Sequence, residues 1–206
     1  MNIGVILAAG KSSRFDNSIP KQLFPINHKP VINYSIDLLS ETLDEVIIVT
    51  NSDCFSKIET DKKILINDID NRIESIKTAL NYLEEKDYSN ILIHDAARPF
   101  ITKDDILRLI DSQNNHQHSQ YFLPLVNGLA KRNESGFWEI PNRDDFIQLC
   151  SPQITDFQIF NKIFNDYILT GLECEILPVA SRLQLRYNLI KGNFNHLRKI
   201  TTTDDL

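Results

Sequence analysis

The segment Ile3-Gly-Val-Ile-Leu-Ala-Ala-Gly-Lys-Ser-Ser-Arg14, close to the N-terminus, carries the clearest signal of the fold. Its first part, Ile3 to Leu7, is a short apolar run of the kind that forms a strand buried on both faces. Small residues, a glycine and two cations follow the run directly. This order is the general form of a phosphate-binding loop, because small side chains let backbone N–H groups approach an anion. An ordinary strand-to-helix turn with surface Lys and Arg fits the segment equally well.

Strand and helix patterns alternate through the rest of the first half of the chain. Buried strands are predicted over Glu45–Thr50, Lys63–Ile66 and Asn90–His94, and helices over Pro30–Leu39, Asn71–Glu84 and a segment capped by Thr102. Repeated β-α-β units with short connections favour a mostly parallel sheet with helices on both faces. We therefore expect an α/β fold with a Rossmann-like, doubly wound sheet.

The second half of the chain no longer shows a regular alternation of strand and helix patterns. Gln113–Gln120 is polar and reads as a loop, and Tyr121–Val126 reads as a strand. Turn signals and short β-like pieces over residues 127–143 predict a small β-arm that projects from the sheet. A helix is expected over Phe157–Ile168, and Cys174–Leu177 and Tyr187–Ile190 are expected to return to the sheet. We see no linker and no repeat, so residues 1–206 are interpreted as one domain.

Composition excludes several functional classes. The chain has 206 residues, of which 42% are hydrophobic and 24% charged, an ordinary globular balance. Its formal net charge of −6 does not fit a binder of nucleic acid or of anionic membranes. No apolar run approaches the length that spans a bilayer. The three cysteines are odd in number and far apart, which fits no disulfide framework and favours a cytoplasmic location.

The spacing of the motifs indicates which class of phosphate-binding protein the loop belongs to. The loop after Leu7 lacks both the GxxxxGK[ST] and the GxGxxG patterns. Instead, AAGxxxR is followed by Pro20-Lys21-Gln22, which resembles the nucleotidyltransferases that act on sugar and polyol phosphates. A second block, His94-Asp-Ala-Ala-Arg-Pro99, follows a predicted strand, where ligands bind in doubly wound sheets.

This second block resembles the hallmark of the 2-C-methyl-D-erythritol 4-phosphate cytidylyltransferase family, which includes the ribitol-5-phosphate cytidylyltransferases. Three other blocks resemble the family's R-x-x-S, its Arg-containing segment with T-P-Q, and its K-[IVL]-T: Arg72–Ser75, Ile140–Arg143 with Ser151–Gln153, and Lys199–Thr201. The blocks occur in family order along nearly the whole chain. The resemblance implies a fold of the nucleotide-diphospho-sugar transferase type.

The resemblance also implies a reaction and a set of residues. An acceptor phosphate oxygen attacks the α-phosphorus of CTP, and pyrophosphate leaves, while fixed cations stabilise the developing charge. The catalytic residues implied are Arg14, Lys21 and Lys199, with Lys21 on the α-phosphate. The nucleotide-binding residues implied are Ala8, Ala9, Gly10, Asp70, Arg72, Ser75 and Ala96.

On the acceptor side, the resemblance implies Asp95, Arg98, Arg143 and Ser151, with Asp95 also beside a Mg²⁺ ion. Acceptor-side groups in the family come partly from the arm of the neighbouring subunit, so a homodimer through residues 127–143 is implied. The partners implied are CTP and a small phosphorylated polyol or sugar, with no nucleic acid and no membrane.

The acceptor remains open at this point. 2-C-Methyl-D-erythritol 4-phosphate is the default, and ribitol 5-phosphate or a similar compound is the next candidate. The family's T-D-[ED]-[AS] segment is missing, with Leu177–Ser181 nearest, and Ile69 stands where relatives have glycine. A nucleotidyltransferase that uses another nucleoside triphosphate and a sugar 1-phosphate, and a non-catalytic nucleotide-binding relative, are the alternatives.

Overall fold

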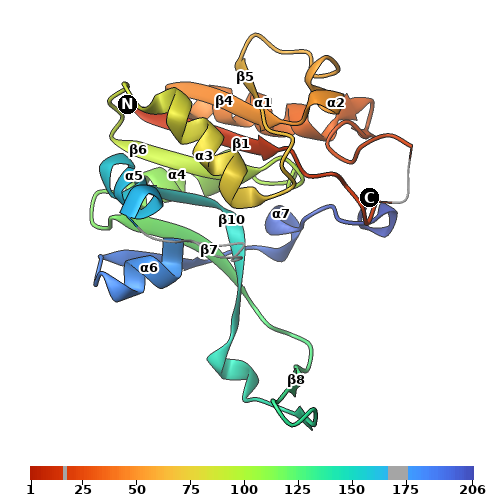
Figure 1. The fold of residues 1–206 in the computed structure, drawn as a ribbon, viewed down its shortest axis with the longest axis vertical. Helices are drawn as coiled ribbons and strands as arrows, with labels where there is room; N and C mark the ends of the chain where they lie inside the picture. Colours follow the sequence, from red (N-terminus) through yellow and green to blue (C-terminus); the bar gives the residue numbers. More distant parts are fainter. Residues whose placement is uncertain (16–17, 167–175) are drawn as a thin grey trace.

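A seven-stranded sheet forms the centre of the protein (Figure 1). The computed structural model describes residues 1–15, 18–166 and 176–206. Across the sheet the strands run in the order β11 (Tyr187–Lys191), β7 (His118–Pro124), β10 (Ile147–Asp156), β6 (Asn90–Asp95), β1 (Asn2–Ala8), β4 (Glu45–Thr50) and β5 (Lys63–Ile66). The strands predicted from their apolar runs are thereby confirmed, but the expected burial of Lys63–Ile66 is wrong, because β5 lies at the edge of the sheet and its end residues are exposed.

The strands from β6 to β5 are parallel, with β1 in the centre. Because these strands are parallel, their carboxyl ends meet at one edge, where Ala8, Thr50 and Asp95 end their strands. The doubly wound, mostly parallel sheet predicted from the sequence is confirmed. Its exception is β10, which runs antiparallel to both β6 and β7.

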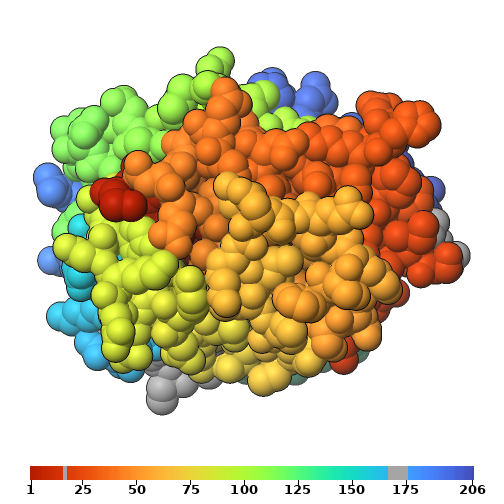
Figure 2. All heavy atoms as spheres, turned by 90° about the horizontal axis from the view of Figure 1, so that it is seen from above, coloured from red at the N-terminus to blue at the C-terminus, as the bar shows by residue number. Residues whose placement is uncertain are grey.

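Helices cover both faces of the sheet. The helices are α1 (Val31–Thr42), α2 (Ser52–Phe55), α3 (Arg72–Leu83), α4 (Lys103–Ser112), α5 (Phe157–Asp166), α6 (Ile176–Arg182) and α7 (Phe194–Leu197). Apolar side chains of α1 and α4 pack with one face of the sheet, and those of α3, α5 and α6 pack with the other. From above, the segment from β4 to α3 (orange to yellow) crosses the centre of the surface (Figure 2). None of the described helices is both long and apolar enough to cross a membrane.

The prediction of a loop over Gln113–Gln120 is wrong at its C-terminal end, because β7 begins at His118. His118, Ser119 and Gln120 are all buried in the sheet. Two of these side chains have partners outside β7: His118 Nδ1 lies 2.8 Å from Thr155 Oγ1 of β10, and Ser119 Oγ accepts a hydrogen bond from Gln113 at the end of α4. Partners of this kind cannot be seen in a local polarity pattern.

Strand β10 is not among the predicted elements. Pro152 lies in its middle, and proline normally argues against a central strand. Here Pro152 falls where the register between β10 and β7 shifts, between Cys150 and Gln153. At such an irregularity the sheet can tolerate a residue that has no N–H donor.

The expected return of Cys174–Leu177 to the sheet is wrong for Ile176 and Leu177, which begin α6. Cys174 lies outside the described residues. Ile176, Val179 and Ala180 recur at helical spacing, and their burial against the core decides the conformation. Leu177–Ser181 therefore belongs to this helix.

The segment between β7 and β10 extends away from the sheet (Figure 1). Within it, β8 (Lys131–Arg132) and β9 (Trp138–Glu139) pair as a short antiparallel hairpin. The 3-10 turn η1 (Arg143–Asp145) follows the hairpin and leads into β10. A second short pair, β2 (Pro25–Ile26) with β3 (Lys29–Pro30), precedes α1, and the 3-10 turn η2 (Thr203–Asp205) lies at the C-terminus.

Candidate active site

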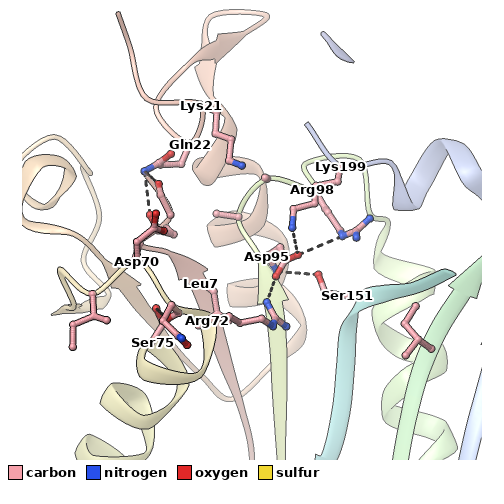
Figure 3. A pocket seen from close by; sticks show the side chains of 18 residues that line it. Leu7, Lys21, Gln22, Asp70, Arg72, Ser75, Asp95, Arg98, Ser151 and Lys199 are labelled. Carbon is pink, nitrogen blue, oxygen red and sulfur yellow. Dashed lines mark hydrogen bonds and ion pairs between the residues drawn. The ribbon is translucent and has the colours of Figure 1, made fainter. Parts of the chain in front are cut away.

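A pocket opens at the carboxyl edge of β1 and β6, beside the N-terminus of α3 (Figure 3). It brings together twelve of the residues singled out from the sequence: Ala8, Ala9, Gly10, Lys21, Asp70, Arg72, Ser75, Asp95, Ala96, Arg98, Ser151 and Lys199. It is also lined by Leu7, Gln22, Ile69, Asn71, Ala97 and Leu149. Most of these side chains come from segments that follow strands, because parallel strands deliver their carboxyl ends to one place.

Three cations surround Asp95, which ends β6 in the pocket (Figure 3). Its Oδ2 lies 3.1 Å from Lys199 Nζ and 3.7 Å from Arg98 Nε. Its Oδ1 accepts a hydrogen bond from Arg72 Nη1. Burial by itself would raise the pKa of this carboxyl, but the attraction of Arg72, Lys199 and Arg98 outweighs burial and holds the pKa well below its usual range. Asp95 is therefore a fixed negative charge around which cations are arranged.

Lys21 lies in the turn after Pro20 and points into the same pocket (Figure 3). Its burial lowers the pKa of the ammonium group, and the nearby Lys199 and Arg14 lower it further. Asp95 and Asp70 act in the opposite direction, but the net shift is downward. Lys21 thus sits among like charges, in an environment that a bound anion would relieve.

The C-terminal segment positions Lys199 through the residue that follows it. The Ile200 side chain is fully buried in a small cluster with Phe15 and Val31, and its N–H donates to Ala97 O at 2.8 Å. Phe15 belongs to the loop after β1, so the same cluster joins that loop to the chain beside Lys199. Packing by apolar neighbours fixes where this lysine can reach.

The N-terminus of α3 is built by two asparagines. Asn71 caps the helix by accepting hydrogen bonds from Ile73 N and Glu74 N, which places Arg72 and Ser75 on the first turn. The buried Asn67 donates to Ser75 Oγ at 2.8 Å and to Ile69 O at 3.0 Å. The hydroxyl of Ser75 is therefore held in place at the edge of the pocket.

On the opposite side, β10 contributes Ser151. Its Oγ accepts a hydrogen bond of 3.0 Å from the backbone N–H of Asp95. Arg98, which is also buried, donates from Nη1 to Leu197 O, close to the segment that carries Lys199. The two sides of the pocket are thus tied to the end of β6.

Two residues singled out from the sequence do not line the pocket. Arg14 lies in the loop after β1, near enough to Lys21 to affect its pKa. Arg143 lies on the projecting segment, where its Nη1 donates to Val126 O at 3.1 Å. The fold does not bring Arg143 to the pocket of its own chain.

The expected contact of Asp95 with a metal ion would compete with the ion pairs of this carboxylate. Both of its carboxylate oxygens already face cations, so a divalent ion there would have to displace them. Within residues 1–15, 18–166 and 176–206, no group of three His, Cys, Asp or Glu side chains could hold a metal ion. The expected contact of Asp95 with a Mg²⁺ ion therefore stays a prediction, while the ion pairs give Asp95 a role of its own in holding the cations of the pocket together.

Sequence reasoning gave no role to Gln22 or Asn67. Gln22 stands inside the PKQ motif, and its position in that motif was a signal that could have been followed. Asn67 follows directly after β5 at the carboxyl edge, where polar residues gather around ligands. Both side chains are buried, and both hold backbone that lines the pocket.

The whole chain is similar to one family of known enzymes. The family model described as 2-C-methyl-D-erythritol 4-phosphate cytidylyltransferase matches residues 3–206. Curated enzymes of that name from Clostridium botulinum (strain ATCC 19397) and Thermosipho melanesiensis are 34% and 31% identical. Both alignments cover 100% of this chain, and they cover 94% and 95% of the relatives. The crystal structure of 4-diphosphocytidyl-2C-methyl-D-erythritol synthase from Anaerococcus prevotii has the same fold, with a TM-score of 0.82, 19% identity, and coverage of 100% of this chain and 94% of that one. This chain is therefore a member of the 2-C-methyl-D-erythritol 4-phosphate cytidylyltransferase family.

Proposed function

We propose that this protein transfers CMP from CTP to 2-C-methyl-D-erythritol 4-phosphate and releases pyrophosphate, a step of isoprenoid biosynthesis. The observation that carries the proposal is the convergence of Lys21, Arg72, Arg98 and Lys199 on one pocket at the carboxyl edge of the sheet. A triphosphate and a phosphorylated acceptor both need such cations. Family membership over the whole chain supports the same reaction.

In the proposed step, a phosphate oxygen of the acceptor forms a bond to the α-phosphorus of CTP. The bond between the α-phosphorus and the bridging oxygen breaks, and pyrophosphate leaves with the electron pair. Negative charge gathers on the α-phosphate during the exchange, so groups fixed beforehand can stabilise it. Lys21 would contact the α-phosphate, while Lys199 and Arg14 would hold the rest of the triphosphate chain.

The nucleoside would occupy the end of the pocket beside α3. Ser75 and Asp70 offer polar groups there, and Ala8, Ala9, Gly10 and Ala96 leave room for close approach of backbone to ligand. Ile69 has an exposed side chain at the same end. Arg72 links this end to the reaction centre through its ion pair with Asp95.

The acceptor would bind on the side of β10. Ser151 and Arg98 stand on that side, and the fixed charge of Asp95 can accept a hydrogen bond from an acceptor hydroxyl. We propose Mg²⁺ as the divalent ion of the reaction, carried mainly by phosphate oxygens and water, with Asp95 beside it.

We further propose a homodimer formed through the projecting segment. Val126, Phe137, Trp138 and Ile140 all carry exposed apolar side chains on this segment. Such a cluster is typical of a surface that is covered by a partner. Arg143 lies beside it, and an exchange of arms would bring this cation to the acceptor side of the other subunit's pocket.

A cytoplasmic location accords with the state of the cysteines. Cys54 and Cys150 are buried free thiols, which persist in a reducing compartment.

Pyrophosphate release tests the proposal directly. The purified protein is assayed with CTP, UTP, ATP and GTP, each with 2-C-methyl-D-erythritol 4-phosphate, ribitol 5-phosphate and a sugar 1-phosphate. We expect the fastest release with CTP and 2-C-methyl-D-erythritol 4-phosphate. Faster release with ribitol 5-phosphate would reassign the acceptor, and faster release with another triphosphate would reassign the nucleotide. CTP binding without release in any combination would make the chain a non-catalytic nucleotide binder.

A further inference from the structure

We infer that Gln22 is a positioning residue that fixes Lys21 relative to the loop of Ala8, Ala9 and Gly10. This inference rests on the cytidylyl transfer proposed above. The Gln22 side chain is almost completely buried, although Lys21 beside it reaches into the pocket. A polar side chain in such a place needs partners, and its partners define what it holds.

The amide of Gln22 joins two separate parts of the pocket wall. Its Nε2 donates to Ala8 O at 3.1 Å, and lies 3.5 Å from Gly10 O and 3.2 Å from Cys54 Sγ. Ala8 ends β1, and Gly10 lies in the loop that follows it. By binding these carbonyl oxygens, the amide keeps them from turning toward the phosphates, which an anion-binding loop requires.

The other end of the amide leads back to Lys21. Gln22 Oε1 accepts a hydrogen bond from Ser12 Oγ at 3.0 Å. Ser12 Oγ in turn accepts one from the backbone N–H of Lys21 at 3.3 Å. The hydrogen bonds therefore run from the loop through Gln22 and Ser12 to the backbone of Lys21. This path ties the lysine that meets the α-phosphate to the backbone that cradles the nucleotide.

The backbone conformation supports the same interpretation. Ser12 has a φ angle of 56°, in the left-handed region that L-residues seldom adopt. Such a conformation persists when the surroundings impose it, and the two bonds of its hydroxyl do so here. The loop is thus held in one arrangement before any ligand binds, which is the preorganisation that charge stabilisation needs.

Glutamine is the side chain that this arrangement requires. The position needs a donor for the two carbonyls and an acceptor for the hydroxyl within one planar group. Glutamate has the same shape but would bring an acceptor to Ala8 O, and methionine fills the space without either function. If Gln22 merely filled the core, methionine would replace it with no change in turnover.

The test is a double-mutant cycle with Gln22→Met and Lys21→Ala, read as kcat and as KM for each substrate. Alone, Gln22→Met should lower kcat by about tenfold or more, with the KM for the acceptor little changed. In the Lys21→Ala background the same substitution should cost about threefold or less, because the residue through which it acts is gone. Gln120→Met, a second buried glutamine outside the pocket, is the matched control and should lower thermal stability without lowering kcat.

Two results would overturn the inference: wild-type kcat in Gln22→Met, or an equal loss in both backgrounds. If Gln22→Met lowered kcat equally in both backgrounds, and Lys21→Ala by itself lowered kcat strongly, the inference would fail but the proposed function would stand. If Gln22→Met does not fold, Ser12→Gly breaks the same path while tolerating the left-handed backbone, and the same coupling with Lys21 is expected. If the wild type binds CTP without turnover, the proposed function fails, and the coupling is read instead from CTP affinity by calorimetry.

Discussion

Lys199 Nζ lies 3.1 Å from Asp95 Oδ2, although one residue lies near the C-terminus and the other ends a central strand. Lys21 comes to the same pocket from the turn that follows the first strand. Each of these contacts depends on the sheet, because only the order of its strands brings these segments together. The candidate active site is therefore a property of the fold, and we expect substitutions at these positions to affect stability and turnover differently.

Substitution Asp95→Asn should destabilise the protein by about 3–5 kcal/mol at neutral pH, because it leaves three cations without their buried counter-charge. The folded protein lowers the pKa of this carboxyl below its ordinary value of 3.8. The stability that the charge contributes is therefore present above that value, and is lost as the pH falls through the folded-state pKa. Thermal unfolding should show a large difference between the two proteins at neutral pH that narrows below about pH 4.

The control for this prediction is Asp37→Asn, which breaks an exposed ion pair with Lys29 and should change stability by less than about 1 kcal/mol. If the difference between wild type and Asp95→Asn stayed constant into the acid range, the carboxylate would not be the charge that the cations require.

The lowered pKa of Lys21 predicts an alkaline limit to activity. Since only the protonated ammonium can stabilise the triphosphate, kcat/KM for CTP should fall as the pH rises, with an apparent pKa below the ordinary lysine value of 10.5. Lys21→Arg should have lower activity but a flatter alkaline limb, because a guanidinium keeps its proton. A pH profile of kcat/KM measures both. Lys29→Arg changes an exposed lysine and is the control, which should keep the wild-type pH profile. If the alkaline limb of kcat/KM were unchanged in Lys21→Arg, the titration would belong to another group.

If arms are exchanged in a dimer, two inactive variants should restore activity to each other. Lys21→Ala damages a chain's own pocket, while Arg143→Ala damages the arm that the chain offers to its partner. Mixed dimers then contain one intact site, so an equal mixture should recover about a quarter of the wild-type turnover after subunit exchange.

A mixture of Lys21→Ala with Lys199→Ala is the control and should recover nothing, because both residues belong to the pocket of their own chain. Equal recovery in both mixtures, or none in the first despite proven exchange, would remove Arg143 from the partner's site.

Much of the fold could be predicted because its central strands are almost entirely apolar. The apolar runs of β1, β4 and β6 are buried on both faces, so their sequences carry the whole signal. Strand β10 carries no such signal, since Pro152, Ser151 and Gln153 interrupt it and their environment comes from neighbouring strands. Ile176 and Leu177 could have formed a strand as easily as a helix from their local pattern.

The site also has features that could be predicted from the sequence and features that could not. Lys21, Asp95 and Lys199 belong to recognisable motifs, so their meeting could be anticipated. The ion pairs that engage both oxygens of Asp95 could not, because they depend on how Arg72 and Lys199 fold around the end of β6. Gln22 was missed because its role depends on contacts with Ala8 and Ser12 that exist only after folding.

The role of Lys21 in the transfer is tested by the turnover of Lys21→Ala with CTP and 2-C-methyl-D-erythritol 4-phosphate. We expect kcat to fall by more than about tenfold, while thermal unfolding shows an intact fold, because the substitution removes charge stabilisation from the transition state. Pyrophosphate release at a rate close to that of the wild type would remove Lys21, and with it the convergence of cations, from the mechanism.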